Sequence, residues 1–255
     1  MKIEIFDTTL RDGEQGAGVE FSTDDKLRVI HALDDLGVSY IEAGMMTDDP
    51  AKHAFFDTLA DISLKNAKLA VFGKAQADYV KGGGGSGDVS TPYIRSLQDG
   101  FAEKQAEGKI ETFDPLTKFY ADYVTERYAA QDKPGRVAEP ALPQELVDSA
   151  RAWTDTAMVV ISRFSGEGYD RTGAPNDGDF YLSLAEEAMV EQVKAAFDKI
   201  VVVLNTGGMM DTLWFKDEPK IASSLLAWQP GMVGGLAIAD ILCGDAFPSG
   251  HLTDT

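Results

Sequence analysis

The apolar stretch AMVVI, residues 157–161, decides the fold class of this 255-residue chain. Every side chain in it is apolar, and a polar, glycine-containing segment follows directly at Ser162. A strand that is apolar on both faces is typical of the centre of a parallel sheet, because helices cover such a sheet on both sides. The stretch therefore predicts an α/β protein with this strand near the middle of its sheet.

Expected strands and helices alternate on both sides of this stretch. Patterns typical of strands lie at residues 3–6, 38–43, 69–72, 111–116, 200–204 and 224–228. Patterns typical of helices lie at residues 23–37, 55–62, 97–101, 118–128, 144–153, 184–197 and 234–242. The pair Thr91–Pro92 has the residue types of an N-cap and a first turn, so a helix is expected to begin there. This alternation predicts a doubly wound, mostly parallel sheet (a flavodoxin-like α/β sandwich), extended or flanked by an N-terminal βαβα piece.

The composition is that of an ordinary soluble globular protein and argues against two classes of partner. The chain is 44% hydrophobic and 25% charged, and its formal net charge is −19. Nucleic acid and anionic membrane surfaces repel such a polyanion. No apolar run approaches the roughly 20 residues that a membrane helix needs, and the first residues lack a signal-peptide pattern. Cys243 is the single cysteine, so no intramolecular disulfide is expected and the expected location is the cytoplasm.

In a parallel sheet, ligands bind beyond the carboxyl ends of the strands, which directs attention to three loops at residues 7–18, 82–90 and 162–181. The first carries the motif DTTLRDGEQ, residues 7–15. A carboxylate at a strand end can hold a divalent cation, and a nearby arginine can neutralise an enolate or a carboxylate. A solvated polar turn is the alternative interpretation of the same residues.

The motif resembles the signature of the citramalate, isopropylmalate and homocitrate synthases, which condense acetyl-CoA with a 2-oxo acid on a TIM barrel. The similarity continues through YIEAG, residues 40–44, and LKNAKLAVFG, residues 64–73. The resemblance implies that Asp12 is a metal ligand and that Arg11 stabilises the developing enolate oxygen. It also implies that the N-terminal βαβα piece comes from a TIM barrel.

The resemblance implies further metal ligands that this chain does not contain. A His-x-His pair from a late barrel strand completes the metal site of those synthases, but the histidines here are His31, His53 and His251. A lone carboxylate is a poor site for a divalent cation. No cofactor is therefore expected. A divalent metal and a citramalate-synthase-like acyl transfer are kept as an alternative with an incomplete site.

The second loop contains the run GGGGSG, residues 82–87. It fits the dinucleotide-binding pattern G-x-G-x-x-G, but it does not follow its strand immediately as that fingerprint requires. A flexible linker is a second interpretation, since Gly/Ser tracts are flexible. The longer stretch FGKAQADYVKGGGGSGDVSTPY, residues 72–93, resembles the entrance to the second domain of family 3 β-glucosidases. A natural loop is therefore favoured, with the join between the two family segments within residues 69–73.

The third loop carries SGEGYDR, residues 165–171, in which glycines on both sides allow turns that expose Glu167. From these residues alone, a solvated loop glutamate and a functional glutamate are equally good interpretations. Tyr169 offers a face on which sugars stack, and Asp170 and Arg171 are expected to shape the loop as a charge-assisted pair. The segments VVISRFSGEGYDR, GDFYLS, VVVLNTGG, LLAWQPGMVGGLAIADILCGD and PSGHLTDT resemble family 3 glycoside hydrolases, in the order of that family. The resemblance implies that Glu167 is the general acid/base of a retaining glycosidase and that a β-glucoside or another sugar is its ligand.

Retaining hydrolysis needs a second carboxylate as nucleophile, and in that family it lies on a separate TIM barrel that residues 1–67 do not resemble. We therefore expect a chimera: a partial synthase segment at residues 1–67 and a hydrolase α/β sandwich domain at residues 68–255, inactive by itself. A β-glucosidase component that works with a partner barrel is the alternative. The strands of the first segment have open edges, which makes homodimerisation through an exposed sheet edge an expectation as well.

Overall fold

The computed structural model describes residues 6–15, 21–35, 38, 40–43, 55 and 68–250, apart from Asp170. The chain divides into two compact units, Met1–Ala67 and Lys68–Thr255. Of the helix expected at residues 55–62, only Phe55 is described, and it is helical. The last residues of the motif PSGHLTDT lie outside the described part of the chain.

The described part of the first unit is a small parallel βαβ piece. It contains β1 (Phe6–Asp7), the 3-10 turn η1 (Gly13–Gln15), α1 (Thr23–Asp35) and β2 (Tyr40–Ile41). The strands β1 and β2 pair in parallel as a two-stranded sheet. Among the described residues of this unit, Leu10, Ile30 and Phe55 form a buried hydrophobic cluster. Each strand has one hydrogen-bonded neighbour among the described strands, and homodimerisation through such an edge stays a prediction.

The second unit is built on a five-stranded sheet in the order β4-β3-β5-β6-β7, in which every pair is parallel. Its strands are β3 (Lys68–Phe72), β4 (Glu111–Thr112), β5 (Thr156–Arg163), β6 (Lys199–Thr206) and β7 (Ile221–Leu226). The predicted strand at residues 157–161 lies within β5, in the middle of this order. The expected doubly wound α/β sandwich is thereby confirmed.

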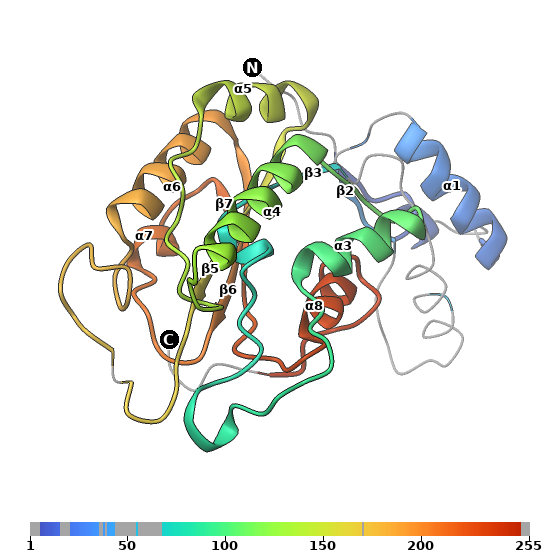
Figure 1. Cartoon of the computed structure of the whole chain (residues 1–255). Coiled ribbons are helices and arrows are strands. Elements are labelled where there is room, and N and C mark those ends of the chain that lie inside the picture. The colour runs from blue at the N-terminus through green and yellow to red at the C-terminus, as the bar shows by residue number, and fades with distance from the viewer. Residues whose placement is uncertain are drawn as a thin grey trace. The chain divides into compact units, whose positions relative to one another are not determined.

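Helices cover both faces of the sheet (Figure 1). One layer contains α3 (Leu97–Ala106) and α8 (Gly234–Leu242), and the other contains α4 (Asp114–Ala129), α5 (Gln144–Trp153) and α6 (Leu184–Ala196). A short helix, α7 (Leu213–Lys216), was not expected from the sequence. No helix in the described ranges is long and apolar enough to cross a bilayer.

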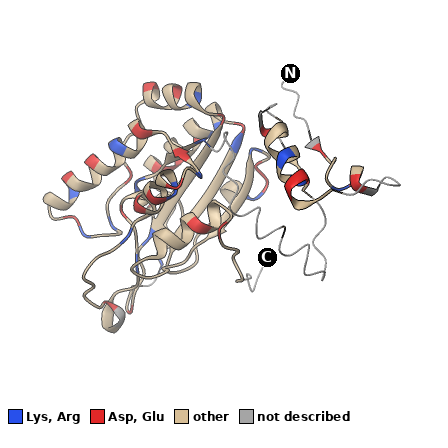
Figure 2. Ribbon diagram, turned by 90° about the vertical axis from the view of Figure 1, so that its right-hand side faces the viewer, with Lys and Arg blue, Asp and Glu red and all other residues tan. Residues whose placement is uncertain are grey.

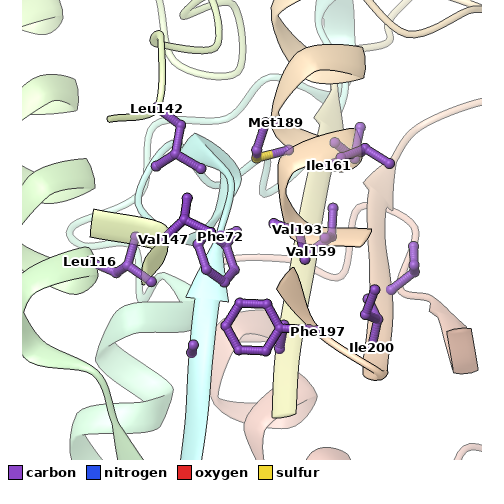
Figure 3. Close-up of a cluster of buried hydrophobic side chains, with 14 of the residues drawn as sticks. Phe72, Leu116, Leu142, Val147, Val159, Ile161, Met189, Val193, Phe197 and Ile200 are labelled. Atoms are coloured by element: carbon purple, nitrogen blue, oxygen red, sulfur yellow. The ribbon is translucent and has the colours of Figure 1, made fainter. Parts of the chain in front are cut away.

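The side chains of β5 alternate between two buried clusters, as the two-residue period of a strand requires. Val159 and Ile161 pack under α4, α5 and α6, in the cluster that Figure 3 shows around Phe72 and Phe197. Met158 and Val160 pack in the opposite cluster with residues of α3 and α8. The stretch AMVVI thus supplies both cores at once, which is why it is apolar throughout.

Three local expectations are wrong. The helix expected to begin at Thr91–Pro92 begins at Leu97, because Ser96 and Asp99 form a capping box there. The strand expected at residues 111–116 ends at Thr112, since a helix with proline in its first turn starts at residue 114. The last strand ends at Leu226, and Trp228 has a φ of 53°, outside the range of strands.

Acidic residues are spread along the helices and loops of both units, with basic residues among them (Figure 2). The net charge of −19 is therefore distributed over many positions.

Candidate active site

The glycine run and the Glu167 loop, far apart in sequence, lie against each other. The backbone N–H of Gly84 donates a hydrogen bond to the Ser165 carbonyl oxygen at 3.1 Å, and Gly84 forms a parallel bridge with Gly166. A Cβ atom on Gly166 would lie 2.5 Å from the Gly84 nitrogen, closer than real Cβ contacts come. The two loops therefore approach this closely because both contact residues are glycines.

Glu167 lies at the tip of a tight turn and is exposed. The N–H of Tyr169 donates to the Gly166 carbonyl at 3.0 Å, which closes the turn around Glu167. A Cβ atom added to Gly85 would lie 3.0 Å from both Cβ and Oε2 of Glu167, so the carboxylate covers this glycine. The Glu167 side chain thus lies on the glycine run and is accessible to solvent.

The glycine run does not open a helix. A 3-10 turn occupies Gly85–Gly87, and the next helix begins only at Leu97. A dinucleotide fingerprint needs a helix N-terminus at the glycines to meet the pyrophosphate. The interpretation as a nucleotide site is therefore wrong, and the natural-loop interpretation agrees with the contacts to Gly166 and Glu167.

Asn205, at the end of β6, holds the approach to the glycine run. Its side-chain oxygen accepts from the Val80 N–H at 2.7 Å, and its side-chain nitrogen donates to the carbonyl oxygens of Val80 at 3.0 Å and Trp228 at 2.7 Å. The side chain is 1% exposed. One buried amide thus joins the segments that follow β3 and β7.

Asp78 is the centre of a buried polar network beneath the loops. Its carboxylate accepts hydrogen bonds from Lys74 Nζ at 2.6 Å, the Tyr128 hydroxyl at 2.7 Å and the backbone N–H groups of Gly135 at 2.5 Å and Val137 at 3.3 Å. Burial, together with the neighbouring Asp78 carboxylate, raises the pKa of Tyr128. The network attaches the loop at residues 132–143 to the end of β3.

Two further buried carboxylates line the same region. Glu186 forms a bidentate pair with Arg163, with both oxygens 2.7 Å from guanidinium nitrogens and both side chains 5% exposed. Glu139 Oε2 accepts from the Lys74 backbone N–H at 3.0 Å. Burial raises the pKa of Glu139 to about 8, above its ordinary value of 4.5. These groups surround a cavity of about 410 Å³ beside Arg171 and Tyr169.

Arg171 shapes the loop through a partner other than the expected one. Its Nη1 lies 2.5 Å from Asp179 Oδ1 and donates to the Phe164 carbonyl at 3.1 Å. The Arg171 guanidinium lowers the pKa of Asp179, as do hydrogen bonds from Thr172, although burial acts in the opposite direction. Asp170, the expected partner, lies outside the described residues.

The fold and this geometry agree with the comparisons to known proteins. The family model described as Glycosyl hydrolase family 3 C-terminal domain matches residues 62–255. The chain belongs to this family. A family model described as HMGL-like matches residues 2–83. The chain is thus a fusion of segments from two enzyme families, which confirms the expected double resemblance.

Three relatives illustrate the two parts. β-Glucosidase A of Butyrivibrio fibrisolvens is 46% identical in an alignment 211 positions long, which covers 75% of this chain and 25% of the relative. (R)-citramalate synthase of Aquifex aeolicus is 47% identical over 75 residues, 29% of this chain and 14% of the relative. The structure of β-glucosidase 3B from Thermotoga neapolitana in complex with glucose is 33% identical, with a TM-score of 0.60 over 78% of this chain and 30% of that one. The chain spans 25% of β-glucosidase A and 30% of β-glucosidase 3B, well under half of either enzyme.

The HMGL-like segment keeps two of the predicted site residues side by side. Arg11 Nη1 lies 2.8 Å from Glu42 Oε1, and this pair raises the pKa of Arg11. Asp12 is mostly exposed, 3.9 Å from Arg11 Nε. No group of three His, Cys, Asp or Glu side chains that could hold a metal ion occurs in the part of the chain that is described. The metal role of Asp12 and the enolate-stabilising role of Arg11 stay predictions.

Sequence reasoning missed Glu42, Asp78, Arg136 and Asn205. Glu42 lies within the quoted motif YIEAG, and Asp78 lies within the stretch that leads to the glycine run, but neither pattern gave its carboxylate a role. Arg136 lies in a proline-containing loop that reads as a plain surface segment. Their roles depend on partners far away in sequence, so no local pattern could have pointed to them.

Proposed function

We propose that this chain is the acid/base half of a family 3 β-glucosidase site, with Glu167 as general acid/base, and that it does not turn over substrate without a partner. The observation that carries the proposal is the contact between the glycine run and the Glu167 turn at the carboxyl edge of the sheet. The proposed ligand is a β-glucoside or a related sugar, and the proposed location is the cytoplasm.

The proposed chemistry uses the carboxyl group of Glu167 for two successive proton transfers. As an acid, Glu167 would protonate the glycosidic oxygen of the leaving group, and as a base it would later deprotonate the attacking water. Both steps require an accessible carboxylate, and Glu167 is exposed on the glycine run. The nucleophilic carboxylate must lie about 5–5.5 Å away in a retaining enzyme. The family resemblance assigns it to the barrel domain.

The test is turnover of aryl β-glucosides by the chain alone and after addition of the barrel portion of β-glucosidase A from Butyrivibrio fibrisolvens. We expect no turnover by the chain alone and measurable turnover by the mixture. Glu167→Gln should lower kcat for 4-nitrophenyl β-glucoside about 10²-fold or more, the range of general acid catalysis. The loss of kcat/KM, which reports the departure of the leaving group, should be smaller with a 2,4-dinitrophenyl group, because that group departs without a proton. The loss of kcat should remain, because the attacking water still lacks its base.

Glu187→Gln is the matched control, since Glu187 is also exposed but lies on α6. Turnover by the chain alone that Glu167→Gln abolishes would overturn the need for a partner. Turnover by the mixture that survives Glu167→Gln would overturn the acid/base role.

A further inference from the structure

The guanidinium of Arg136 lies over two aromatic rings of the Glu167 loop. Its guanidinium carbon is 4.5 Å from the ring centroid of Phe164 and 4.5 Å from that of Tyr169. The two rings are themselves in edge contact, with centroids 5.6 Å apart and an interplanar angle of 89°. A cation over aromatic faces at such distances is attracted by the negative faces of the rings. Arg136 thus contacts both ends of the segment that contains Glu167.

Hydrogen bonds to a buried carboxylate fix the backbone on both sides of Arg136, although Arg136 itself is exposed. The residues on both sides, Gly135 and Val137, donate their N–H groups to the buried Asp78 carboxylate. Gly135 has a φ of 76°, and a Cβ atom there would lie 2.7 Å from a methyl carbon of Val80. The Arg136 side chain therefore extends from a backbone segment whose position is fixed by these contacts.

Few contacts within the turn that carries Glu167 stabilise its conformation. Glycines flank Glu167 on both sides, and Gly168 has a φ of 76° with open space around it. Tyr169 is 54% exposed and closes the turn by its hydrogen bond to Gly166. The ring of Tyr169 contacts Arg136 and Phe164, and this contact attaches the far side of the turn to the rest of the unit.

We propose that Arg136 is a positioning residue for Glu167: it holds the ring of Tyr169 against Phe164 and so keeps the turn closed, with the Glu167 carboxylate on Gly85. The proposal rests on the proposed function for its catalytic consequence, but not for its structural part. Arg136 acts through Tyr169 and does not itself transfer a proton.

The structural part is tested by hydrogen exchange of the Tyr169 amide, measured by NMR on the full chain. This N–H is bonded to Gly166 within the turn, so its exchange rate reports opening of the turn. Arg136→Ala should accelerate its exchange about tenfold, the size expected for the loss of two cation–π contacts. Arg136→Lys, which keeps a cation over the rings, should restore most of the protection.

Two comparisons isolate the effect. Lys133→Ala removes another exposed cation of the same loop and should leave the Tyr169 rate unchanged. The amide of Val160, in the central strand, should exchange equally slowly in all variants, which shows that the fold is intact. Unchanged exchange at Tyr169 in Arg136→Ala would overturn the proposal, as would an unprotected Tyr169 amide in the unaltered chain.

The catalytic part is tested in the mixture with the barrel portion. Arg136→Ala should lower kcat about tenfold with a smaller change in KM, and Arg136→Lys should recover most of kcat. If accelerated exchange appears but the mixture is inactive even with unaltered Arg136, the proposed function fails while the positioning of the turn stands. If the mixture is active and kcat does not depend on Arg136, the positioning role is overturned.

Discussion

Both units of this chain carry a recognisable family motif, but the charged side chains in the two units differ in their burial and in the number of their hydrogen-bond partners. In the first unit, Arg11 pairs with Glu42 at 2.8 Å and with Asp12 at 3.9 Å, and the side chains of Arg11, Glu42 and Asp12 are 38%, 25% and 57% exposed. In the second unit, the pair of Lys74 with Asp78 is 4% and 0% exposed, and Asp78 accepts several further hydrogen bonds. Buried pairs are costly to break because they leave a charge without a partner, whereas exposed pairs contribute little.

The difference shows which half-site is preorganised. In the second unit, helices, strands and loops distant in sequence all contact the network beneath the Glu167 loop, so its geometry follows from the packing of the whole domain. In the first unit, a parallel pair of two short strands and one helix support the Arg11 motif in the described residues. A sequence motif alone therefore says little about how firmly its side chains are held.

The largest expected effect is that of breaking the network at Asp78. Asp78→Ala removes the carboxylate that faces the buried Lys74 ammonium, so it should lower the free energy of unfolding by about 3–5 kcal/mol, as for other broken buried pairs. Urea unfolding measures this loss. The double variant Lys74→Met/Asp78→Ala should recover part of it, because no buried charge is then left alone. A loss under about 1 kcal/mol would contradict the contrast between the units.

The next effect is a pH dependence that arises from Glu139. Its pKa in the folded chain is about 8, above the ordinary 4.5, so its proton stabilises the folded state. Both states carry the proton below pH 4.5. As the pH rises towards 8, the unfolded chain loses the proton first, and stability falls by up to about 1.4 kcal/mol per pH unit.

Urea unfolding at pH 5 and pH 8 measures this fall. Glu139→Gln should remove this contribution, whereas Glu145→Gln, at an exposed position of α5, should leave it unchanged. An identical pH dependence in the Glu139→Gln variant and the unaltered chain would show that the buried carboxyl does not cause it.

The smallest expected effect lies in the first unit. Glu42→Gln removes the ion pair with Arg11, and the free energy of unfolding should change by no more than about 1 kcal/mol, because the pair is partly exposed and screened by salt. Thermal unfolding at low and high salt measures it, with the difference between variant and unaltered chain shrinking at high salt. A loss as large as that expected for Asp78→Ala would remove the distinction between the two units.

Much of the fold could be predicted because its causes are local. The apolar run of β5, the glycines between loops and the helical periodicities each follow from one stretch of sequence, and they led to the α/β sandwich. Errors arose where one local signal competed with another. Thr91–Pro92 has the residue types of a helix start, but the reciprocal bonds of Ser96 and Asp99 satisfy more backbone donors and define the actual one.

For the candidate site, the family resemblance singled out Glu167, and the flanking glycines in the sequence indicated that it would be exposed. That the glycine run lies directly on the Glu167 turn follows from tertiary structure, since the contact joins residues that the chain brings together only when β3 and β5 become neighbours. The same holds for Arg136 and Asp78. Their partners are determined by the packing of distant loops over the same edge of the sheet. No pattern within one segment of sequence shows which distant residues will lie next to it.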